Sequence, residues 1–406
     1  MWNDLKTKHR ITLLGIYCIV LFLVQACGST AHPQTNIVIA TSWLAANLDG
    51  NAWPTIGHDA AHTGMYGAQD QKSLPELHGH VVWQQNTGGS IFSAPVLANG
   101  TVYIGSTGGD VLALDAATGV VRWKHAIGQF FNDSTPVVVG RVVFVAAEST
   151  WMLALDATSG KQLWATDTHE VIKAAPTYAS GMVLVNASTT TLALDARTGM
   201  VRWRFHESGA GWPTTASPAV QGNLVYVVQG TNPVVYALNL VNGHTVWSYR
   251  VGGRLISTPL VTGQDVIAGT YDGHVLSLDK ATGLLQWMYD VNTALPRGMP
   301  RDGIAGSPAA ANGTIFIGTY DGDILAIDAG DGRLLWSRLI DAPVLDVPVV
   351  AGGTLYVSGG QALYALNVKH GTVGWRLALG DVRNDLALGS GRLYAGTVQG
   401  FVYALD

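Results

Sequence analysis

Short runs of apolar residues with a period of two recur along most of this chain and predict β-strands. Val102–Gly105 and Val111–Leu114 are two such runs, rich in Val, Leu and Ile. The segment between them, Ser106–Asp110, contains two glycines and is typical of a tight turn. The pattern therefore predicts antiparallel strand pairs joined by short turns.

The stretch Ala113–Trp123 ends one strand, makes a polar turn and begins the next strand. It reads Ala-Leu-Asp-Ala-Ala-Thr-Gly-Val-Val-Arg-Trp. Asp115 and Thr118 have side chains that hydrogen-bond turn backbone, Gly119 supplies a positive φ, and the tryptophan is a large apolar anchor. Copies of this stretch recur to the end of the chain, so the chain is a repeat protein.

Eight tryptophans mark the repeats at intervals of about 40–50 residues, as expected of propeller blades. Each has a glycine four residues earlier, and all from the second onward have Asp or Asn eight residues earlier. A buried aromatic side chain covers about 150–250 Å², so we expect all eight to dock one blade on another. They are Trp83, Trp123, Trp164, Trp203, Trp247, Trp287, Trp336 and Trp375.

A proline opens the first apolar run of seven repeats. Proline is tolerated at the start of a strand or along a sheet edge, which suits an innermost strand facing a central channel. Each repeat is therefore expected to form four short antiparallel strands. The prolines are Pro95, Pro136, Pro176, Pro218, Pro259, Pro308 and Pro348.

The two ends of the chain predict how the ring closes. Val402–Asp406 stops just before a turn and a tryptophan strand, and Gly79–Trp83 supplies that piece with no inner strands before it. Three C-terminal strands and one N-terminal strand would complete the last blade and remove the exposed edges. The predicted fold of residues 74–406 is an all-β, eight-bladed propeller of four-stranded antiparallel blades.

The N-terminal residues predict export. A basic stretch precedes the apolar run Ile11–Ala26, which is shorter than the ~20 residues of a spanning helix and suits a signal peptide. Val24–Gly28 resembles a bacterial lipobox, with Gln25 as a less typical member, and the resemblance implies cleavage before Cys27 and lipidation of its thiol. An uncleaved N-terminal anchor is the alternative. The expected division is a signal peptide at 1–26, the lipidated cysteine and a flexible tether at 27–50, a lead-in segment at 51–73 and the propeller at 74–406.

Composition narrows the classes of partner. The 406 residues include 49 glycines, only 13% are charged, and the formal net charge is −5. No basic stripe exists to neutralise phosphates, which argues against a nucleic-acid partner. Cys18 lies in the expected signal peptide and Cys27 would be lipidated, so no cysteine remains for a disulfide, a nucleophile or a cysteine-based metal site.

The repeated pattern Ala-x-Asp-x-x-Thr-Gly-x-x-x-Trp resembles the docking motif of pyrroloquinoline-quinone-like (PQQ-like) propeller repeats over residues 74–406. Trp53–Gly64 also resembles a lead-in that often precedes such propellers. This superfamily contains quinoprotein alcohol and glucose dehydrogenases, non-enzymatic envelope propellers and the propeller lipoprotein of the outer-membrane barrel-assembly machine. The resemblance implies the fold and leaves the cofactor open, because many such propellers bind no quinone.

Quinoprotein dehydrogenases of this type carry an adjacent cysteine pair and long insertions with calcium ligands and a catalytic Asp. The mature chain has no cysteine pair and its blades are near minimal length, so we expect no catalytic residue, cofactor or metal ion, with PQQ and calcium as the alternative. His58–His62 has the two-histidine spacing of a helical zinc site, but flanking glycines favour a capping loop. Asp328–Gly332 resembles half a calcium loop at a turn that every repeat has.

The two faces of the expected disc differ in their loops. The blade-to-blade connections and the second-to-third-strand turns share one face and vary, whereas the turns of the other face are uniform. Aromatic and arginine residues on variable loops are typical of a protein-recognition surface; the alternative is that they pack their own turns or plug the channel. The predicted partner-binding residues are Phe130, Phe131, Trp151, Trp212, Tyr271, Arg297, Arg301 and Tyr320.

Five polar residues occupy equivalent places just before the inner strands, and we expect them to ring the channel mouth, where a small polar ligand has room. They are Ser93, Ser134, Ser257, Asp346 and Asn384. The predicted function is that of an exported, envelope-anchored lipoprotein that binds envelope proteins through its variable-loop face as an interaction scaffold. The alternatives are a PQQ-dependent alcohol or sugar dehydrogenase and a ligand-sensing envelope propeller.

Overall fold

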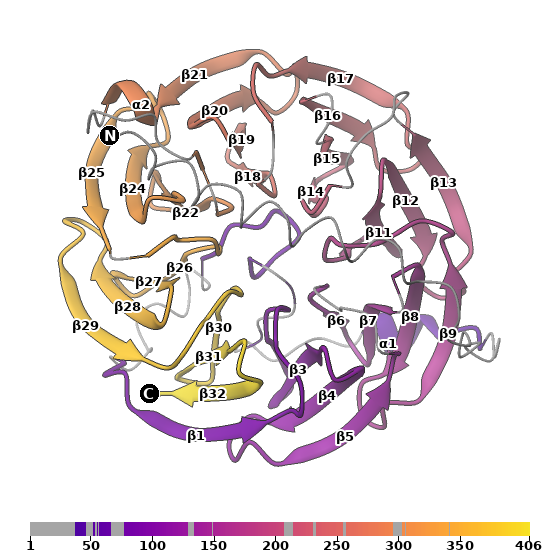
Figure 1. Cartoon of the computed structure of the whole chain (residues 1–406). Coiled ribbons are helices and arrows are strands. Elements are labelled where there is room, and N and C mark those ends of the chain that lie inside the picture. The colour runs from indigo at the N-terminus through magenta and orange to yellow at the C-terminus, as the bar shows by residue number, and fades with distance from the viewer. Residues whose placement is uncertain are drawn as a thin grey trace, which may run out of the picture. The chain divides into compact units, whose positions relative to one another are not determined.

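Eight four-stranded antiparallel sheets surround a central axis in the computed structural model of this chain (Figure 1). Each sheet is one blade, so the predicted eight-bladed propeller is confirmed. The described residues all belong to one compact unit, Gln34–Asp406. They are residues 37–45, 52, 55, 57–65, 77–128, 134–147, 149–206, 214–229, 233–254, 257–294, 303–304, 306–340 and 342–406.

Seven blades are built from consecutive strands. Blade 1 contains β2 (Val96–Ala98), β3 (Thr101–Ser106), β4 (Asp110–Asp115) and β5 (Val121–Ala126); blade 2 contains β6 (Val137–Val139), β7 (Val142–Ala147), β8 (Trp151–Asp156) and β9 (Gln162–Asp167); blade 3 contains β10 (Thr177–Ala179), β11 (Met182–Ala187), β12 (Thr190–Asp195) and β13 (Val201–His206); blade 4 contains β14 (Ala219–Gln221), β15 (Leu224–Gln229), β16 (Val234–Asn239) and β17 (Thr245–Arg250).

The second half of the ring repeats this order. Blade 5 contains β18 (Leu260–Thr262), β19 (Asp265–Gly269), β20 (His274–Asp279) and β21 (Leu285–Asp290); blade 6 contains β22 (Ala309–Ala311), β23 (Thr314–Gly318), β24 (Asp323–Asp328) and β25 (Leu334–Leu339); blade 7 contains β26 (Val349–Ala351), β27 (Thr354–Gly359), β28 (Ala362–Asn367) and β29 (Val373–Ala378). Blade 8 combines β30 (Ala387–Gly389), β31 (Arg392–Gly396) and β32 (Phe401–Leu405) with β1 (Val81–Asn86). Among the described residues, two short helices, α1 (Thr41–Leu44) and α2 (Val291–Ala294), lie outside the blades.

Burial follows the position of a strand within its blade. In blade 1, every residue of β3 is buried, and so is all of β4 except its last residue, whereas β5 is mostly exposed, with Trp123 buried and His125 partly buried. Apolar side chains of neighbouring blades form shared clusters, one of which contains Leu112, Leu363 and Leu393 from blades 1, 7 and 8. The core therefore lies between blades, and each middle strand is covered on both faces.

The turn at Asp115 shows how the repeat sequence makes its local structure. Asp115 Oδ1 accepts hydrogen bonds from the backbone N–H groups of Ala117 and Thr118, and from the Thr118 hydroxyl at 2.9 Å. Hydrogen bonds from Arg122 and Thr118 lower the pKa of Asp115 to about 2. Gly119 follows with a φ of 76°, a conformation that glycine adopts without steric cost.

All eight tryptophans that we expect to dock the blades contact a neighbouring blade. The indole N–H of Trp83 donates to the carbonyl oxygen of Ala116 at 3.0 Å, and a Cβ on Gly119 would lie 2.6 Å from the Trp83 ring. Glycine at this place therefore lets the indole lie directly on the turn. The other seven indoles, Trp123, Trp164, Trp203, Trp247, Trp287, Trp336 and Trp375, donate to the carbonyl oxygens of Ala157, Ala196, Leu240, Lys280, Ala329, Val368 and Leu77.

The last blade is shared by the two ends of the propeller, as predicted. β1 pairs antiparallel with β32 and places Trp83 opposite Ala404 (Figure 1). The indole of Trp375 in blade 7 donates to Leu77, which precedes it by 298 residues. Main-chain pairing and tryptophan docking therefore both close the ring.

Part of the expected tether contacts the propeller. Ile39 is only 2% exposed, and its backbone N–H donates to the carbonyl of Arg197 in blade 3. The guanidinium of Arg141 in blade 2 lies 4.5 Å from the ring centroid of Trp43, within the range of a cation–π contact. Residues 37–45 therefore pack on blades 2 and 3.

Part of the expected lead-in segment lies along the innermost strands of four blades (Figure 1). The backbone N–H groups of Val220, Val261, Ala310 and Val350, in β14, β18, β22 and β26, donate to the carbonyl oxygens of Ala60, Ala61, Thr63 and Gly64. These bonds cover the inner edges of blades 4 to 7, which are otherwise unpaired.

Candidate functional site

The blade-to-blade connections and the turns between second and third strands meet on one side of the ring, which we call the connection face. Backbone hydrogen bonds tie these two kinds of loop together. The N–H of Tyr271, in a turn, donates to the carbonyl of Arg254, in a connection, at 2.8 Å, and Val398 donates to Asp381 in the same way. The variable loops therefore form one continuous surface on a rigid ring.

Two of the predicted partner-binding residues meet on this face. The rings of Tyr271 in blade 5 and Tyr320 in blade 6 lie 5.5 Å apart in an edge-to-face arrangement, and Tyr271 is 43% exposed. Trp151 begins β8 in blade 2, where it packs partly buried on the apolar cluster of blades 1 and 2. The other predicted partner-binding residues lie outside the described residues, as does the predicted lipidation site: Phe130, Phe131, Trp212, Arg297, Arg301 and Cys27.

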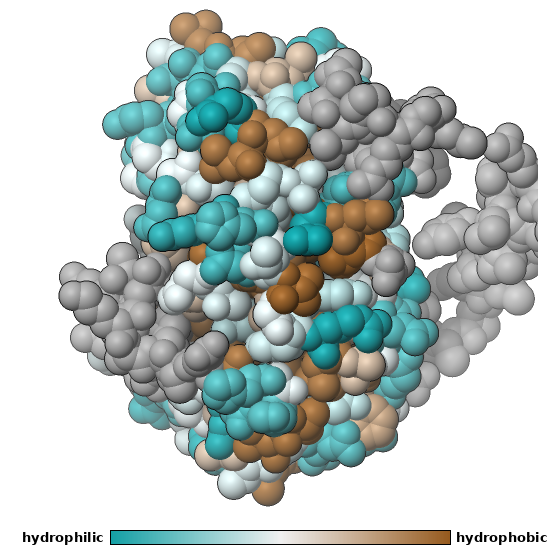
Figure 2. Space-filling model, turned by 90° about the vertical axis from the view of Figure 1, so that its left-hand side faces the viewer, coloured by the Kyte–Doolittle hydropathy of each residue, from teal (hydrophilic) through white to brown (hydrophobic). Residues whose placement is uncertain are grey.

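The outer rim of the ring has a different character. On the side of β25 and β29, hydrophobic residues form small patches among hydrophilic ones (Figure 2). Leu335, Leu339 and Val373 of these strands are 42%, 45% and 44% exposed. Scattered apolar residues of this kind are normal on protein surfaces. The connection face therefore offers the more distinctive contact surface.

A pocket of about 210 Å³ lies where the blade-to-blade connections converge on the axis. Equivalent residues from successive blades line its wall. In most blades this is the residue just before the proline that opens the innermost strand, and a following proline restricts a residue to extended backbone. In blade 8, leucine replaces the proline. The equivalent residues of blades 1 to 8 are Ala94, Thr135, Ala175, Ser217, Thr258, Ser307, Val347 and Asp385, and all except Val347 line the pocket.

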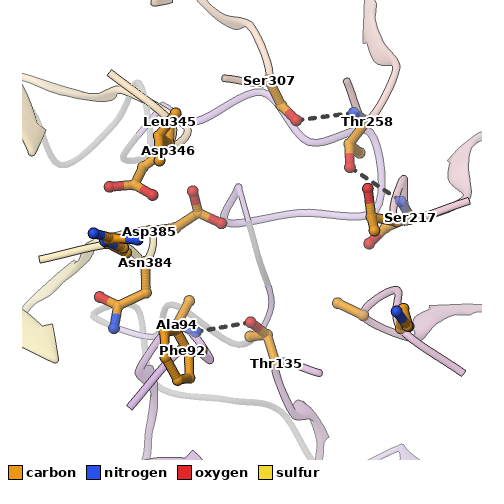
Figure 3. A pocket seen from close by; sticks show the side chains of 14 residues that line it. Phe92, Ala94, Thr135, Ser217, Thr258, Ser307, Leu345, Asp346, Asn384 and Asp385 are labelled. Carbon is orange, nitrogen blue, oxygen red and sulfur yellow. Dashed lines mark hydrogen bonds between the residues drawn. The ribbon is translucent and has the colours of Figure 1, made fainter. Parts of the chain in front are cut away.

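Hydroxyl groups at this position join neighbouring blades. The backbone N–H of Ala94 donates to Thr135 Oγ1 at 2.8 Å, that of Ser217 to Thr258 Oγ1 at 3.0 Å, and that of Thr258 to Ser307 Oγ at 2.9 Å (Figure 3). Each hydroxyl satisfies a buried N–H of the preceding blade. The pocket wall is therefore held in place by the ring itself.

Two carboxyl groups, those of Asp346 and Asp385, lie together on one side of the pocket (Figure 3). Asp346 is 7% exposed, and its Oδ2 has no hydrogen-bond partner among the described residues. Oδ1 of Asp385 accepts a hydrogen bond from the backbone N–H of Val347.

Burial and mutual repulsion oppose ionisation of this pair. Burial, with the charges of Asp385 and Asp381, raises the pKa of Asp346 well above its usual value. Burial also raises the pKa of Asp385 to about 6, although the Val347 hydrogen bond acts in the opposite direction. Neighbouring carboxyl groups cannot both ionise without cost, so the pair keeps a proton to a higher pH than ordinary aspartates do.

Two cationic side chains also line the pocket. The guanidinium of Arg383 pairs with the carboxylate of Asp381, with Nε 2.9 Å from Oδ2. Lys173 is exposed and comes from the connection between blades 2 and 3. The cation in the same connection as Asp385 is therefore already bound to another carboxylate.

The pocket differs in part from the predicted ring of polar residues. Asp346 and Asn384 line it, but the hydroxyls of Ser93, Ser134 and Ser257 hydrogen-bond to the carbonyl oxygens of Gly105, Ala174 and Gly269. Successive side chains of extended backbone point to opposite sides, so in those blades the next residue faces the pocket. The pre-proline position was the sequence signal for these missed residues.

The two segments that resemble metal sites, His58–His62 and Asp328–Gly332, form turns. His58 and His62 have φ values of 77° and 59° and lie in a turn, where His62 Nε2 is 3.0 Å from the carbonyl oxygen of Pro218. Asp328 Oδ1 accepts backbone hydrogen bonds from Gly330 and Asp331, as in the other repeat turns. Within the described residues, no group of three His, Cys, Asp or Glu side chains is arranged to hold a metal ion. No helix in that part of the chain is long and apolar enough to cross a membrane.

Comparison with known proteins gives consistent matches along the propeller. The family model described as outer membrane protein assembly factor BamB matches residues 72–150, 131–229, 191–301 and 294–406. Outer membrane protein assembly factor BamB of Yersinia pestis is 28% identical over 220 residues, which cover 50% of this chain and 55% of that protein. The chain spans about half the length of the curated relatives it matches.

Solved structures share the fold at low sequence identity. BamB from Moraxella catarrhalis superposes with a TM-score of 0.67 at 19% identity, covering 81% of this chain and 99% of the other. A europium-containing methanol dehydrogenase gives a TM-score of 0.72 at 16% identity, covering 88% and 91%. Because one fold supports unrelated activities, these likenesses establish the architecture alone.

Proposed function

This chain belongs to the family of outer membrane protein assembly factor BamB, and we propose that it serves outer membrane protein assembly as a non-enzymatic propeller scaffold. The observation that carries the proposal is the family match, which extends over residues 72–406 and so includes every blade. The scaffold binds envelope proteins of the assembly machinery through its connection face.

The geometry of the connection face supports a role in protein binding. Tyr271 and Tyr320 place an aromatic pair, partly exposed, over two adjacent blades. Tyrosine is enriched at binding hot spots because it offers a large contact area with a polar tip. The loops that carry it are fixed to the ring by backbone hydrogen bonds, so little conformational entropy is lost on binding.

The test places a photo-crosslinking residue on either face of the propeller in cells. Tyr271→benzoylphenylalanine reports on the connection face. Val241, which is 68% exposed in a turn of the opposite face, gives the matched control Val241→benzoylphenylalanine. We expect position 271 to crosslink to a protein of the outer membrane assembly machinery and position 241 to give none. Equal crosslinking from both positions, or none from either, would refute the assignment of this face.

A functional measurement accompanies the crosslinking. The double change Tyr271→Ala with Tyr320→Ala is expected to lower the amounts of assembled outer membrane proteins, whereas Val241→Ala leaves them unchanged. The melting temperature of each purified variant verifies that the ring is intact. Normal outer membrane protein levels in the folded double variant would count against the proposal.

Membrane attachment through a lipid on Cys27 is the second part of the proposal. It rests on the lipobox-like sequence Val24–Gly28. Two or more acyl chains at this cysteine would hold the protein stably at the extracytoplasmic surface of a membrane. Cys27→Ala is expected to move the protein from the membrane fraction to the soluble fraction, and continued membrane association of this variant would contradict the anchor.

A quinone-dependent dehydrogenase is the alternative, because a methanol dehydrogenase has the same fold. The residues of the axial pocket do not fit that cofactor. The pocket of about 210 Å³ is smaller than the ~300–1,000 Å³ of most ligand pockets. Asp346 and Asp385 would also repel the carboxylates of PQQ. We expect no dye reduction when purified protein receives PQQ, calcium and an alcohol or sugar; clear activity would favour the dehydrogenase.

A further inference from the structure

Asp346 presents a buried acceptor that the described part of the protein does not satisfy. The residue is only 7% exposed, and its Oδ2 has no hydrogen-bond partner among the described residues. An unpaired buried carboxylate carries a large desolvation cost. The group is nevertheless aimed into an open pocket beside Asp385 (Figure 3). This arrangement leaves an acceptor that a bound group could satisfy.

The charges around the pair leave it electronegative. Asp381 acts on Asp346 with the same sign as Asp385. Arg383 is the cation in the same connection, but its guanidinium is held by Asp381 at 2.9 Å. Lys173 lines the pocket from an exposed position in another connection. A cation entering the pocket would therefore meet carboxyl groups that the described residues leave without a counter-ion.

We infer that the axial pocket binds an organic cation, whose ammonium or guanidinium group lies between the carboxyl groups of Asp346 and Asp385. Such groups donate several hydrogen bonds and match carboxylates in charge and geometry. The hydroxyl groups of the residues that precede the inner-strand prolines supply further acceptors. Phe92 supplies an aromatic surface of the kind that attracts cations. The volume of about 210 Å³ accommodates a small cationic head with a short stem.

A bare metal ion fits the same residues less well. Calcium takes 6–8 oxygen ligands and magnesium requires an octahedral set. The Asn384 amide is already engaged, because its Nδ2 donates to Ile91 and its Oδ1 accepts from Gly396. Asp385 Oδ1 is bound to the Val347 N–H. Two carboxyl groups with an acceptor-lined gap between them and few free oxygen ligands around them favour a hydrogen-bond donor over a bare ion.

Binding is coupled to the release of a proton. Because burial raises the pKa of Asp385 to about 6 and that of Asp346 well above its usual value, the empty pair keeps its protons to a higher pH than ordinary aspartates do. A cation between the two groups favours their ionised form and displaces a proton. Affinity for the cation should therefore increase as the pH rises through about 6, the pKa of Asp385.

The cationic group has two sources with the same chemistry, a free small molecule or the basic side chain of a polypeptide that reaches the pocket. Isothermal titration of the full chain in detergent with ethylguanidinium chloride tests the shared chemistry, and acetyl-Gly-Arg-Gly-amide tests the peptide source. We expect one saturable site per chain for ethylguanidinium. Peptide binding tenfold tighter or more indicates a polypeptide source, and equal or weaker peptide binding indicates a free cation; both results support the site.

Two variants decide whether these residues form the site. Asp346→Asn keeps the shape and removes the charge, and should weaken ethylguanidinium binding by about tenfold or more, as expected for the loss of a charge-assisted hydrogen bond. Lys173→Gln removes a positive charge from the lining of the same pocket and should raise the affinity for ethylguanidinium, because this charge repels a bound cation. Proton release, measured in buffers of different ionisation enthalpy, should accompany binding to the wild type and disappear in Asp346→Asn.

Three results would overturn the inference. They are the absence of saturable ethylguanidinium binding to the wild type, equal affinity of the folded Asp346→Asn variant, and tighter binding of calcium chloride than of ethylguanidinium at the same pocket. The melting temperature of Asp346→Asn shows whether that variant is folded, and Asp385→Asn repeats the measurement from the other carboxyl group.

Discussion

Asp346 and Asp385 make the stability of the propeller depend on pH. An acid whose pKa is higher in the folded than in the unfolded protein stabilises the fold relatively at low pH, and this contribution disappears as the pH rises through the folded value. For Asp385 this stabilisation is lost between the ordinary pKa of 3.8 and the raised pKa of about 6. Asp346 extends the effect upward, because its pKa is raised well above the usual value.

We expect Asp346→Asn to be more stable than the wild type above pH 7 and to differ less from it at pH 4.5. The substitution removes one buried charge and the repulsion it imposes on Asp385, so the melting temperature should rise by a few degrees at pH 7.5. Thermal unfolding followed by circular dichroism at both pH values measures the difference. A variant less stable than the wild type at pH 7.5 would show that the charge is compensated.

The acid pair itself was only partly predictable at this scale. The position before an inner strand predicts Asp346 and Asn384 at the channel mouth, but Asp385 is not among the residues expected there. The two acids belong to connections of different blades, and only the closed ring places them in one pocket. Whether Asp346 Oδ2 has a hydrogen-bond partner depends on residues that are distant in the sequence, and a local sequence pattern does not contain this information.

Between elements, the contact of a tryptophan with the next blade's turn is the repeated unit of assembly. Glycine at position 119 permits this contact, because a Cβ there would lie 2.6 Å from the Trp83 ring. Gly119 also has a φ of 76°. Gly100 has a φ of 67°, but nothing lies within 4 Å of its Cβ position. Alanine at position 100 would therefore introduce backbone strain alone, whereas alanine at position 119 would introduce both backbone strain and steric overlap with the indole.

Gly100→Ala should lower the free energy of unfolding by about 1–2 kcal/mol, the cost of placing a Cβ in the left-handed region. Gly119→Ala should cost about 1–3 kcal/mol more, because the indole of Trp83 must move or the two blades must separate. Urea unfolding followed by tryptophan fluorescence compares the two variants. Equal losses of stability would mean that the tryptophan contact adds nothing.

The arrangement of elements was the most predictable part of the molecule. Asp115, Thr118 and Gly119 form their turn through contacts within a few residues, so the repeat sequence carries the information locally. The contacts of residues 37–45 and 57–65 depend on distant partners: Ile39 donates to Arg197, and Val220 donates to Ala60. Neither segment has a repeat pattern that would reveal them.

At the scale of the whole molecule, the shared blade 8 determines how the ring holds together. Deletion of residues 395–406 removes β32, which pairs with β1 on one side and β31 on the other. The melting temperature should fall sharply, and the truncated protein should aggregate during gel filtration because β1 becomes an unpaired edge. An unchanged melting temperature and a monomeric elution profile would disprove closure through this blade.

Because blade 8 combines strands from both ends of the propeller, β1 is synthesised long before its partner strand β32. His80 and Asp406 meet in the finished blade but are 326 residues apart in the chain. At ribosomal rates of about 5–20 residues per second, roughly 15–65 s separate their appearance. Blades 1 to 7 can begin to form in that interval, while β1 keeps a free row of backbone donors and acceptors. The newly made protein is therefore most prone to mispairing before β32 (Phe401–Leu405) has been made, however stable the finished ring becomes.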